Sequence, residues 1–96
     1  MEIQWTDEAL DDLASIVSWF RARASERTAD AVLHRIVEQV KGLAVFPERI
    51  RASDRVPGAR ELLVHRLPYI VFVRIRAESI VVLNVVHTAR KFPPAQ

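Results

Sequence analysis

The stretch from Gly58 to Pro93 constrains the fold most, because it reads as three consecutive β-strands followed by a short basic tail. The strand-like runs are Ala59–Leu67, Pro68–Arg76 and Ser79–His87, and only Ala77–Glu78 separates the last two. β-Branched and aromatic residues at this density favour a pleated, half-buried surface. The stretch therefore predicts an antiparallel β-meander.

The first half of the chain predicts a cover for one face of this sheet. Glu2–Trp5 alternates polar and apolar residues, which is typical of a short strand. Thr6 is a favourable N-cap for a helix over Asp7–Arg23, and Ser25 caps a second helix that Pro47 ends. Together these elements predict an α+β fold of order βααβββ, with an antiparallel helical hairpin packed on one face of a three-stranded antiparallel meander.

Length and composition exclude several classes of function. At 96 residues, positions 1–96 are expected to form one domain, and no apolar run is long enough to span a bilayer. The chain has no cysteine and no signal-like N-terminus, which fits a reducing cytoplasm. It has 2 glycines and neither an HExxH nor a CxxC motif, so no metal or cofactor is expected.

Charge is distributed unevenly along the chain. Residues 1–48 carry 9 acidic and 5 basic side chains, a net charge of −4, whereas residues 49–96 carry 3 acidic and 9 basic side chains, a net charge of +6. The predicted sheet and tail are therefore basic and the predicted helices acidic. A basic surface attracts phosphate or a carboxylate-rich partner, although a solvated face that needs no partner explains the asymmetry equally well.

The alternation of side chains assigns the two faces of the predicted sheet. The inward set, which packs on the helices, is wholly apolar: Val71, Val73, Ile75, Val81, Leu83 and Val85. The outward set mixes large apolar groups with arginine: Ile70, Phe72, Arg74, Arg76, Ile80, Val82, Asn84 and Val86.

An exposed face of this kind rarely remains in water without a use. It could dock an apolar peptide with acidic flanks, or the C-terminal tail or a second copy of the chain could cover it. We favour a separate partner, with these predicted partner-binding residues: Ile70, Phe72, Arg74, Arg76, Val82 and Asn84. Trp19, at the edge of the first helical stripe, is interpreted as a core-rim residue rather than a partner anchor.

One set of side chains suggests chemistry. Arg60, Arg74, His87 and Arg90 lie near strand ends or within strands, where hairpin geometry could bring them together. Arginines around a histidine can bind phosphate and support acid–base cleavage of RNA. Taken alone, this composition favours structural salt bridges or simple phosphate binding over catalysis.

Three short motifs then give the chain a resemblance. Pro57–Leu62 is similar to a "PG-x-REL" entry to the sheet, and Pro68–Arg74 to a "PYxVxYR" strand. Val85–Arg90, followed by Pro93, is similar to a "VxHxxR…P" ending. In this order and spacing they resemble the RelE/ParE superfamily of toxins from bacterial type II toxin–antitoxin pairs, over nearly the whole chain.

The resemblance implies a cytoplasmic bacterial toxin, of a kind linked to plasmid stabilization and growth inhibition. Its partner would be a cognate ParD/RelB-like antitoxin whose C-terminal segment wraps and neutralises it. ParE-like members poison DNA gyrase and are not enzymes, whereas RelE-like members cleave messenger RNA on the ribosome. Val73 replaces the usual tyrosine before Arg74, and no lysine lies between Lys41 and Lys91. Both departures favour the ParE branch.

Two alternatives stay open. In a ribosome-dependent endoribonuclease, Arg60 and Arg74 would bind phosphate, His87 would act as acid or base, and Arg90 would stabilise the leaving group. In a degenerate member, only a non-toxic antitoxin-binding module would survive.

Overall fold

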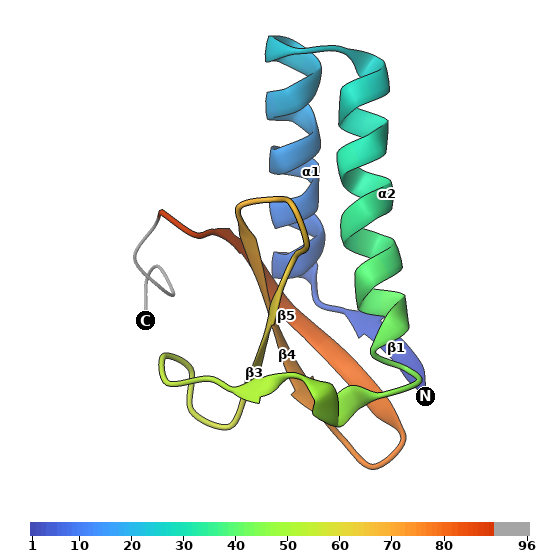
Figure 1. Cartoon of the computed structure of the whole chain (residues 1–96), viewed down its shortest axis with the longest axis vertical. Helices are drawn as coiled ribbons and strands as arrows, with labels where there is room; N and C mark the ends of the chain where they lie inside the picture. The colour runs from blue at the N-terminus through green and yellow to red at the C-terminus, as the bar shows by residue number, and fades with distance from the viewer. Residues whose placement is uncertain (90–96) are drawn as a thin grey trace.

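The computed structural model describes residues 1–89, so the predicted site residue Arg90 lies outside them. In this part of the chain two helices pack on a five-stranded sheet of order β1-β5-β4-β3-β2 (Figure 1). The elements are β1 (Glu2–Trp5), α1 (Asp7–Arg23), α2 (Glu26–Gly42), the 3₁₀ helix η1 (Pro47–Arg49), β2 (Arg51–Ala52), β3 (Arg60–Leu63), β4 (Tyr69–Ile75) and β5 (Ser79–His87).

The predicted α+β class, the helical hairpin and the antiparallel meander β3–β4–β5 are confirmed. Two features differ from the prediction. β1 joins the sheet parallel to β5, and the two-residue strand β2 adds an antiparallel edge beside β3. The sheet is therefore mixed, and its first and last strands in sequence lie side by side.

Both helices begin at the predicted caps. The Thr6 hydroxyl accepts the backbone N–H of Ala9 at 3.0 Å and donates to the carbonyl of Leu83 at 3.0 Å. The Ser25 hydroxyl accepts the N–H of Thr28 at 3.0 Å. An N-cap hydroxyl satisfies a backbone donor that the first helical turn leaves unpaired. Because Thr6 also bonds β5, the same residue fixes the position of α1 on the sheet.

The helices bury their apolar stripes against one face of the sheet. Removal of this apolar surface from water is the main stabilising term for a domain of this size. The buried members of this main core are Ala9, Leu13, Val32, Ile36, Val40, Leu43, Ile50, Leu62, Val64, Tyr69, Val71, Val73, Ile80, Val82 and Val85.

An irregularity in β5 reverses part of the predicted face assignment. Phe72 lies opposite Asn84 but Val73 lies opposite Val82, so Leu83 is an extra residue in β5. One extra residue shifts all following side chains to the other face. Ile80 and Val82 therefore belong to the main core, and their predicted outward position is wrong.

The same shift moves two residues outward. Leu83 packs against the outer apolar cluster, and Val81 lies opposite Arg74, so their predicted inward position is also wrong. Val82 has no exposed surface and cannot contact a partner as predicted. β4 follows the prediction, with Val71 and Val73 in the main core.

The outer face carries a second, smaller apolar cluster. Ile70, Phe72 and Val86 form it, with Val56 and Leu83 packed against them. Ile70 and Phe72 point away from the helices as predicted, but both are buried rather than open to a partner. Val56 comes from the connection between β2 and β3, and this connection helps to cover the face that the sequence predicted to be bare.

Candidate functional site

Arg60 and Arg74 lie on opposite faces of the sheet. Arg60 pairs with Val73, on the helix side, and its Nη1 donates to the carbonyl oxygen of Ile50 at 2.8 Å. Arg74 lies opposite Val81 on the outer face. The β3–β4 hairpin therefore separates these two guanidinium groups.

Arg74 packs against the turn that precedes β3. Gly58 has a φ of +79°, a backbone conformation that favours glycine. A Cβ atom at Gly58 would lie 2.7 Å from Nη1 of Arg74, so the guanidinium occupies the space that glycine leaves. The contact links the "PG" turn before β3 to the arginine of the "PYxVxYR" strand, β4.

His87 lies at the far end of the β4–β5 hairpin from Arg74. It pairs with Tyr69, and the two rings meet edge to face with centroids 5.5 Å apart. Arg74 is five positions after Tyr69 in β4, which corresponds to about 17 Å along a strand. The expectation that hairpin geometry gathers Arg60, Arg74 and His87 is therefore wrong.

One ring nitrogen of His87 is hydrogen-bonded to the backbone. Nδ1 accepts the N–H of Ala89 at 3.0 Å. In the neutral imidazole the proton then resides on Nε2, which can donate but not accept. This arrangement suits a hydrogen-bond donor to a bound group.

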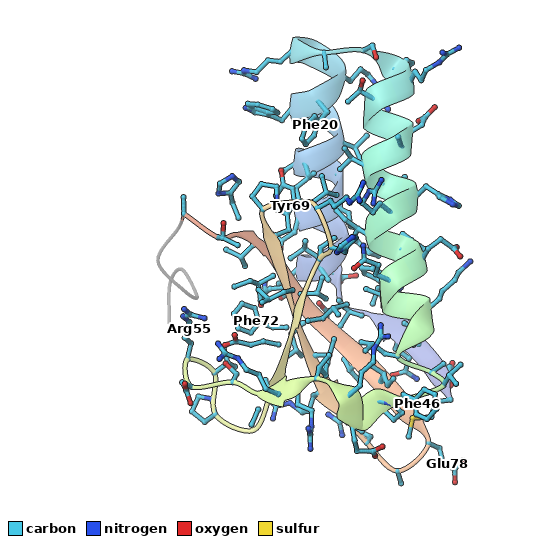
Figure 2. The ribbon with its side chains drawn as sticks, in the orientation of Figure 1. Phe20, Phe46, Arg55, Tyr69, Phe72 and Glu78 are labelled. Atoms are coloured by element: carbon cyan, nitrogen blue, oxygen red, sulfur yellow. The ribbon has the colours of Figure 1, made fainter. Side chains whose placement is uncertain are left out.

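A groove of about 620 Å³ opens between α1 and the neighbouring ends of β4 and β5. Figure 2 shows Phe20 on α1 and Tyr69 at the start of β4, and Figure 1 shows that the helical hairpin extends beyond the sheet at this end. A concave, mostly apolar surface with a few polar groups is the usual form of a binding site. Its lining residues are Asp12, Ser15, Ile16, Trp19, Phe20, Pro68, Tyr69, Val85, His87 and Ala89.

Trp19 is the groove's most accessible aromatic side chain. It is 51% exposed, meets Phe20 edge to face at 5.0 Å, and has the Arg23 guanidinium 4.9 Å from its ring centroid. The Trp19 ring therefore packs against Phe20 and Arg23, while about half of the residue remains exposed to solvent. An ordered, exposed tryptophan beside a groove has the properties of a partner anchor. The sequence analysis interpreted Trp19 as a core-rim residue, and its 51% exposure at the groove leaves the alternative role of partner anchor as a hypothesis.

Asp12 connects the groove to the sheet. Its Oδ2 accepts the backbone N–H of Val85 at 2.9 Å and the side-chain N–H of Asn84 at 3.2 Å. The amide of Asn84, predicted to bind a partner, is therefore engaged by α1. Within residues 1–89, no group of three or more histidine, cysteine, aspartate or glutamate side chains is placed to hold a metal ion.

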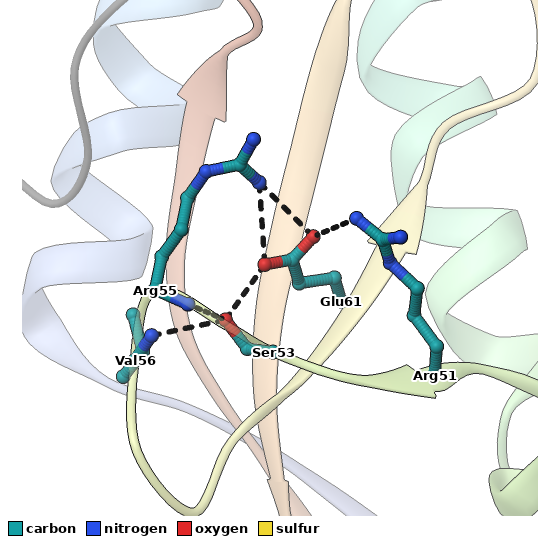
Figure 3. Close-up of polar contacts among 5 residues, drawn as sticks. All are labelled: Arg51, Ser53, Arg55, Val56 and Glu61. Atoms are coloured by element: carbon teal, nitrogen blue, oxygen red, sulfur yellow. Dashed lines mark hydrogen bonds and ion pairs between the residues drawn. The ribbon is translucent and has the colours of Figure 1, made fainter.

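The sequence analysis did not predict that the outer face contains a buried carboxylate, that of Glu61. Glu61 is 3% exposed and accepts hydrogen bonds from Ser53 Oγ at 2.6 Å, Arg55 Nη1 at 3.2 and 3.3 Å, and Arg51 Nη2 at 3.3 Å (Figure 3). Ser53 Oγ in turn accepts the N–H groups of Arg55 and Val56, each at 3.0 Å. The network anchors the connection between β2 and β3 to the sheet.

Several effects act on the pKa of the Glu61 carboxyl. Burial raises it, but hydrogen bonds from Ser53 and Arg51, with the charges of Arg55 and Arg51, outweigh burial and hold the pKa below its usual value of 4.5. Glu61 is therefore ionised near neutral pH.

The comparisons with known proteins agree with this architecture. Residues 3–92 match the family model described as the ParE toxin of the type II toxin–antitoxin system, parDE. A chain from the chromosomal ParDE system of P. aeruginosa is 30% identical, with a TM-score of 0.81, over 91% of this chain and 95% of that one. A search of curated proteins gave no match.

Two further solved structures share the fold at lower identity. The isolated RelE toxin of E. coli is 13% identical with a TM-score of 0.66, over 95% of this chain and 87% of that one. The YoeB/ParE toxin of Agrobacterium tumefaciens is 14% identical with a TM-score of 0.60, over 91% of this chain and 98% of that one.

Fold and motifs together define a toxin domain of the RelE/ParE superfamily. Within that superfamily, the chain belongs to the ParE toxin family of type II toxin–antitoxin systems. In the described part of the chain, neither helix is both long and apolar enough to cross a membrane.

Proposed function

We propose that this toxin acts by binding DNA gyrase in the bacterial cytoplasm and that a cognate antitoxin neutralises it. The separation of Arg60, Arg74 and His87 carries the proposal. A nuclease that uses acid–base chemistry needs its histidine within hydrogen-bond reach of the groups that hold the scissile phosphate. Inhibition of gyrase by binding does not require these three side chains to lie close together. The 30% identity to a chain of a ParDE system also supports the ParE branch.

We propose that the groove between α1 and the ends of β4 and β5 is the binding site for the antitoxin. A groove between a helix and a sheet end fits an apolar segment of a partner chain, and a half-exposed Trp19 provides the anchor. The structure that is 30% identical comes from a ParDE toxin–antitoxin system. The predicted docking site on the outer face fits less well, because Ile70, Phe72 and Val82 are buried.

Two reactions with the purified toxin test the target. One measures supercoiling by gyrase, and the other measures cleavage of a defined messenger RNA in a translation reaction. The gyrase proposal expects blocked supercoiling or trapped cleaved DNA, with intact messenger. Cleavage of messenger only when ribosomes are present would replace it with the RelE-like ribonuclease.

Expression without antitoxin tests toxicity itself. Growth should stop when soluble toxin accumulates. Normal growth with the same amount of soluble protein would leave a non-toxic antitoxin-binding module as the function of the chain.

A further inference from the structure

A second surface lies on the opposite face of the sheet from the helices. Arg51 pairs directly with Glu61, which pairs with Phe72, so both point to the outer face. Arg74 lies two residues after Phe72 in β4, on the same face, and packs on Gly58. Gly58 and Arg55 both belong to the connection between β2 and β3. We name the set formed by Arg51, Arg55 and Arg74 the outer arginine surface.

The charges of this surface do not balance internally. One carboxylate, Glu61, receives two guanidinium groups, and Nη2 of Arg51 and Nη1 of Arg55 both reach its Oε1, at 3.3 and 3.2 Å. A single arginine would neutralise the buried charge. With Arg74, the surface holds three guanidinium groups beside this one buried carboxylate. Asp54 is the one other acidic residue between positions 49 and 61, so the formal charge of these five side chains is still positive.

The two arginines on Glu61 stay accessible although they are held. Their side chains are 65% and 44% exposed for Arg51 and Arg55, whereas that of Glu61 is 1% exposed. Because the carboxylate and the Ser53 turn already restrict them, a ligand would meet guanidinium groups that lose little further freedom on binding. Glu61 thus acts as a positioning residue for this surface.

Guanidinium groups match phosphate oxygens in geometry as well as in charge. Arg51 lies on the edge strand β2, Arg55 in the following loop and Arg74 on the central strand β4. Because the three arginines come from separate elements, they suit a chain of phosphates better than a single ion. The half of the chain that carries these arginines, residues 49–96, has a net charge of +6, against −4 for residues 1–48, and a positive net charge favours approach of a polyanion.

We propose that the outer arginine surface binds the phosphate backbone of a nucleic acid directly. This inference goes beyond the proposed gyrase inhibition, because the contact needs neither gyrase, ribosome nor antitoxin and can be measured without them. It also assigns separate roles to the two sides of the toxin, with the groove on one side and the arginines on the other.

Fluorescence anisotropy with the full-length toxin tests the proposal. The probes are a short DNA duplex and a single-stranded RNA of the same length, each titrated at several salt concentrations. Each phosphate contact contributes about 0.9 to the slope of log affinity against log salt for duplex DNA. Arg51→Gln and Arg55→Gln should each lower that slope by about 1, and Arg51→Lys should restore most of it.

Arg27→Gln is the matched control, since Arg27 is an exposed arginine of α2, on the acidic half of the chain. It should leave the slope unchanged. The melting temperature of each variant is measured in parallel, because a purely structural role of Arg51 or Arg55 would lower the melting temperature and leave the slope as it was.

The two probes also identify the source of the phosphates. Preference for the duplex assigns DNA, preference for the single strand assigns RNA, and either result supports a phosphate-binding surface. The proposal is overturned if neither probe binds at low salt, or if both glutamine variants keep the wild-type slope. Equal binding of a polyglutamate chain would also overturn it and assign an acidic protein instead.

Discussion

The two faces of the sheet are stabilised by different means. The face under the helices is closed mainly by apolar packing, with residues such as Ile36, Val71 and Val82 fully buried, and hydrogen bonds from Thr6 and to Asp12 attach α1 to β5. The outer face has only a small apolar cluster around Phe72, and beside it the buried carboxylate of Glu61 holds a connection that carries arginines. The inner face holds the main core of the fold, whereas the outer face combines a smaller core with charged, accessible side chains.

Phe72→Ala tests whether the outer cluster is a true second core. Phe72 is 1% exposed, so we expect a loss of about 3–5 kcal/mol in the free energy of unfolding, as for other buried phenylalanines. Urea denaturation measures it. Leu63→Ala is the control, because Leu63 lies opposite Ile70 on the same face but is exposed. A loss for Phe72→Ala no larger than for this control would show that the outer cluster adds little.

Trp19→Ala should separate partner binding from folding. Removal of a central aromatic anchor costs about 2 kcal/mol or more, so the antitoxin should bind at least about 30-fold more weakly. The melting temperature should change little, because half of the ring is already exposed. Isothermal titration calorimetry measures the affinity. Leu10→Ala, also exposed on α1 but outside the groove, should bind normally; equal losses for both variants would contradict the assignment.

Glu61→Gln should destabilise the outer face in a pH-dependent way. Loss of charged hydrogen bonds costs about 1.5–3 kcal/mol near neutral pH. Because the pKa of Glu61 is lower in the folded state, its contribution is fully present above the unfolded value and is lost as pH falls through the folded one. The stability difference between wild type and Glu61→Gln should therefore shrink below about pH 4.5. Urea unfolding at pH 7 and at pH 3 to 4 measures it, and a constant difference would contradict the ionised network.

Gly58→Ala and Gly42→Ala should have opposite effects. At Gly58 a Cβ would meet Nη1 of Arg74 at 2.7 Å in a backbone conformation with φ of +79°, so we expect a loss of about 1–2 kcal/mol. Gly42 ends α2, where alanine should gain about 0.5–1 kcal/mol over glycine. Thermal unfolding distinguishes them. An unchanged melting temperature for Gly58→Ala would show that the turn and Arg74 adapt freely.

Sequence periodicity predicted the elements well and the faces only in part. β4 alternates without interruption, so Val71 and Val73 were placed correctly. In β5 the extra residue is Leu83, an ordinary strand residue, and nothing such as glycine or proline marks the irregularity. The face of every residue before it, including Ile80 and Val82, was therefore inverted.

The site was less predictable because its contacts join distant segments. Asp12 reads as one of several acidic residues in a helix, yet it bonds β5 more than 70 residues away. Glu61 was visible in the "REL" motif, but its partner Arg51 lies in the two-residue strand β2 and Ser53 directly follows it, in a segment too short for any periodicity to reveal. Arg60, Arg74 and His87 were recognised as chemically suggestive, whereas their separation depended on strand register.

The parallel pairing of β1 with β5 has a consequence for the order in which the protein can fold. Glu2–Trp5 pairs with residues 79–82, so β1 cannot join the sheet before β5 has been synthesised. Before β5 is present, β1 has no neighbouring strand, and the Thr6 hydroxyl has no Leu83 carbonyl to which it can donate. Long-range pairing of this kind slows folding, because the entropy of closing a long loop is lost before the contact stabilises it. Because β5 also supplies Val85 and His87 to the groove beside α1, the same late strand completes both the β1 edge of the sheet and the groove.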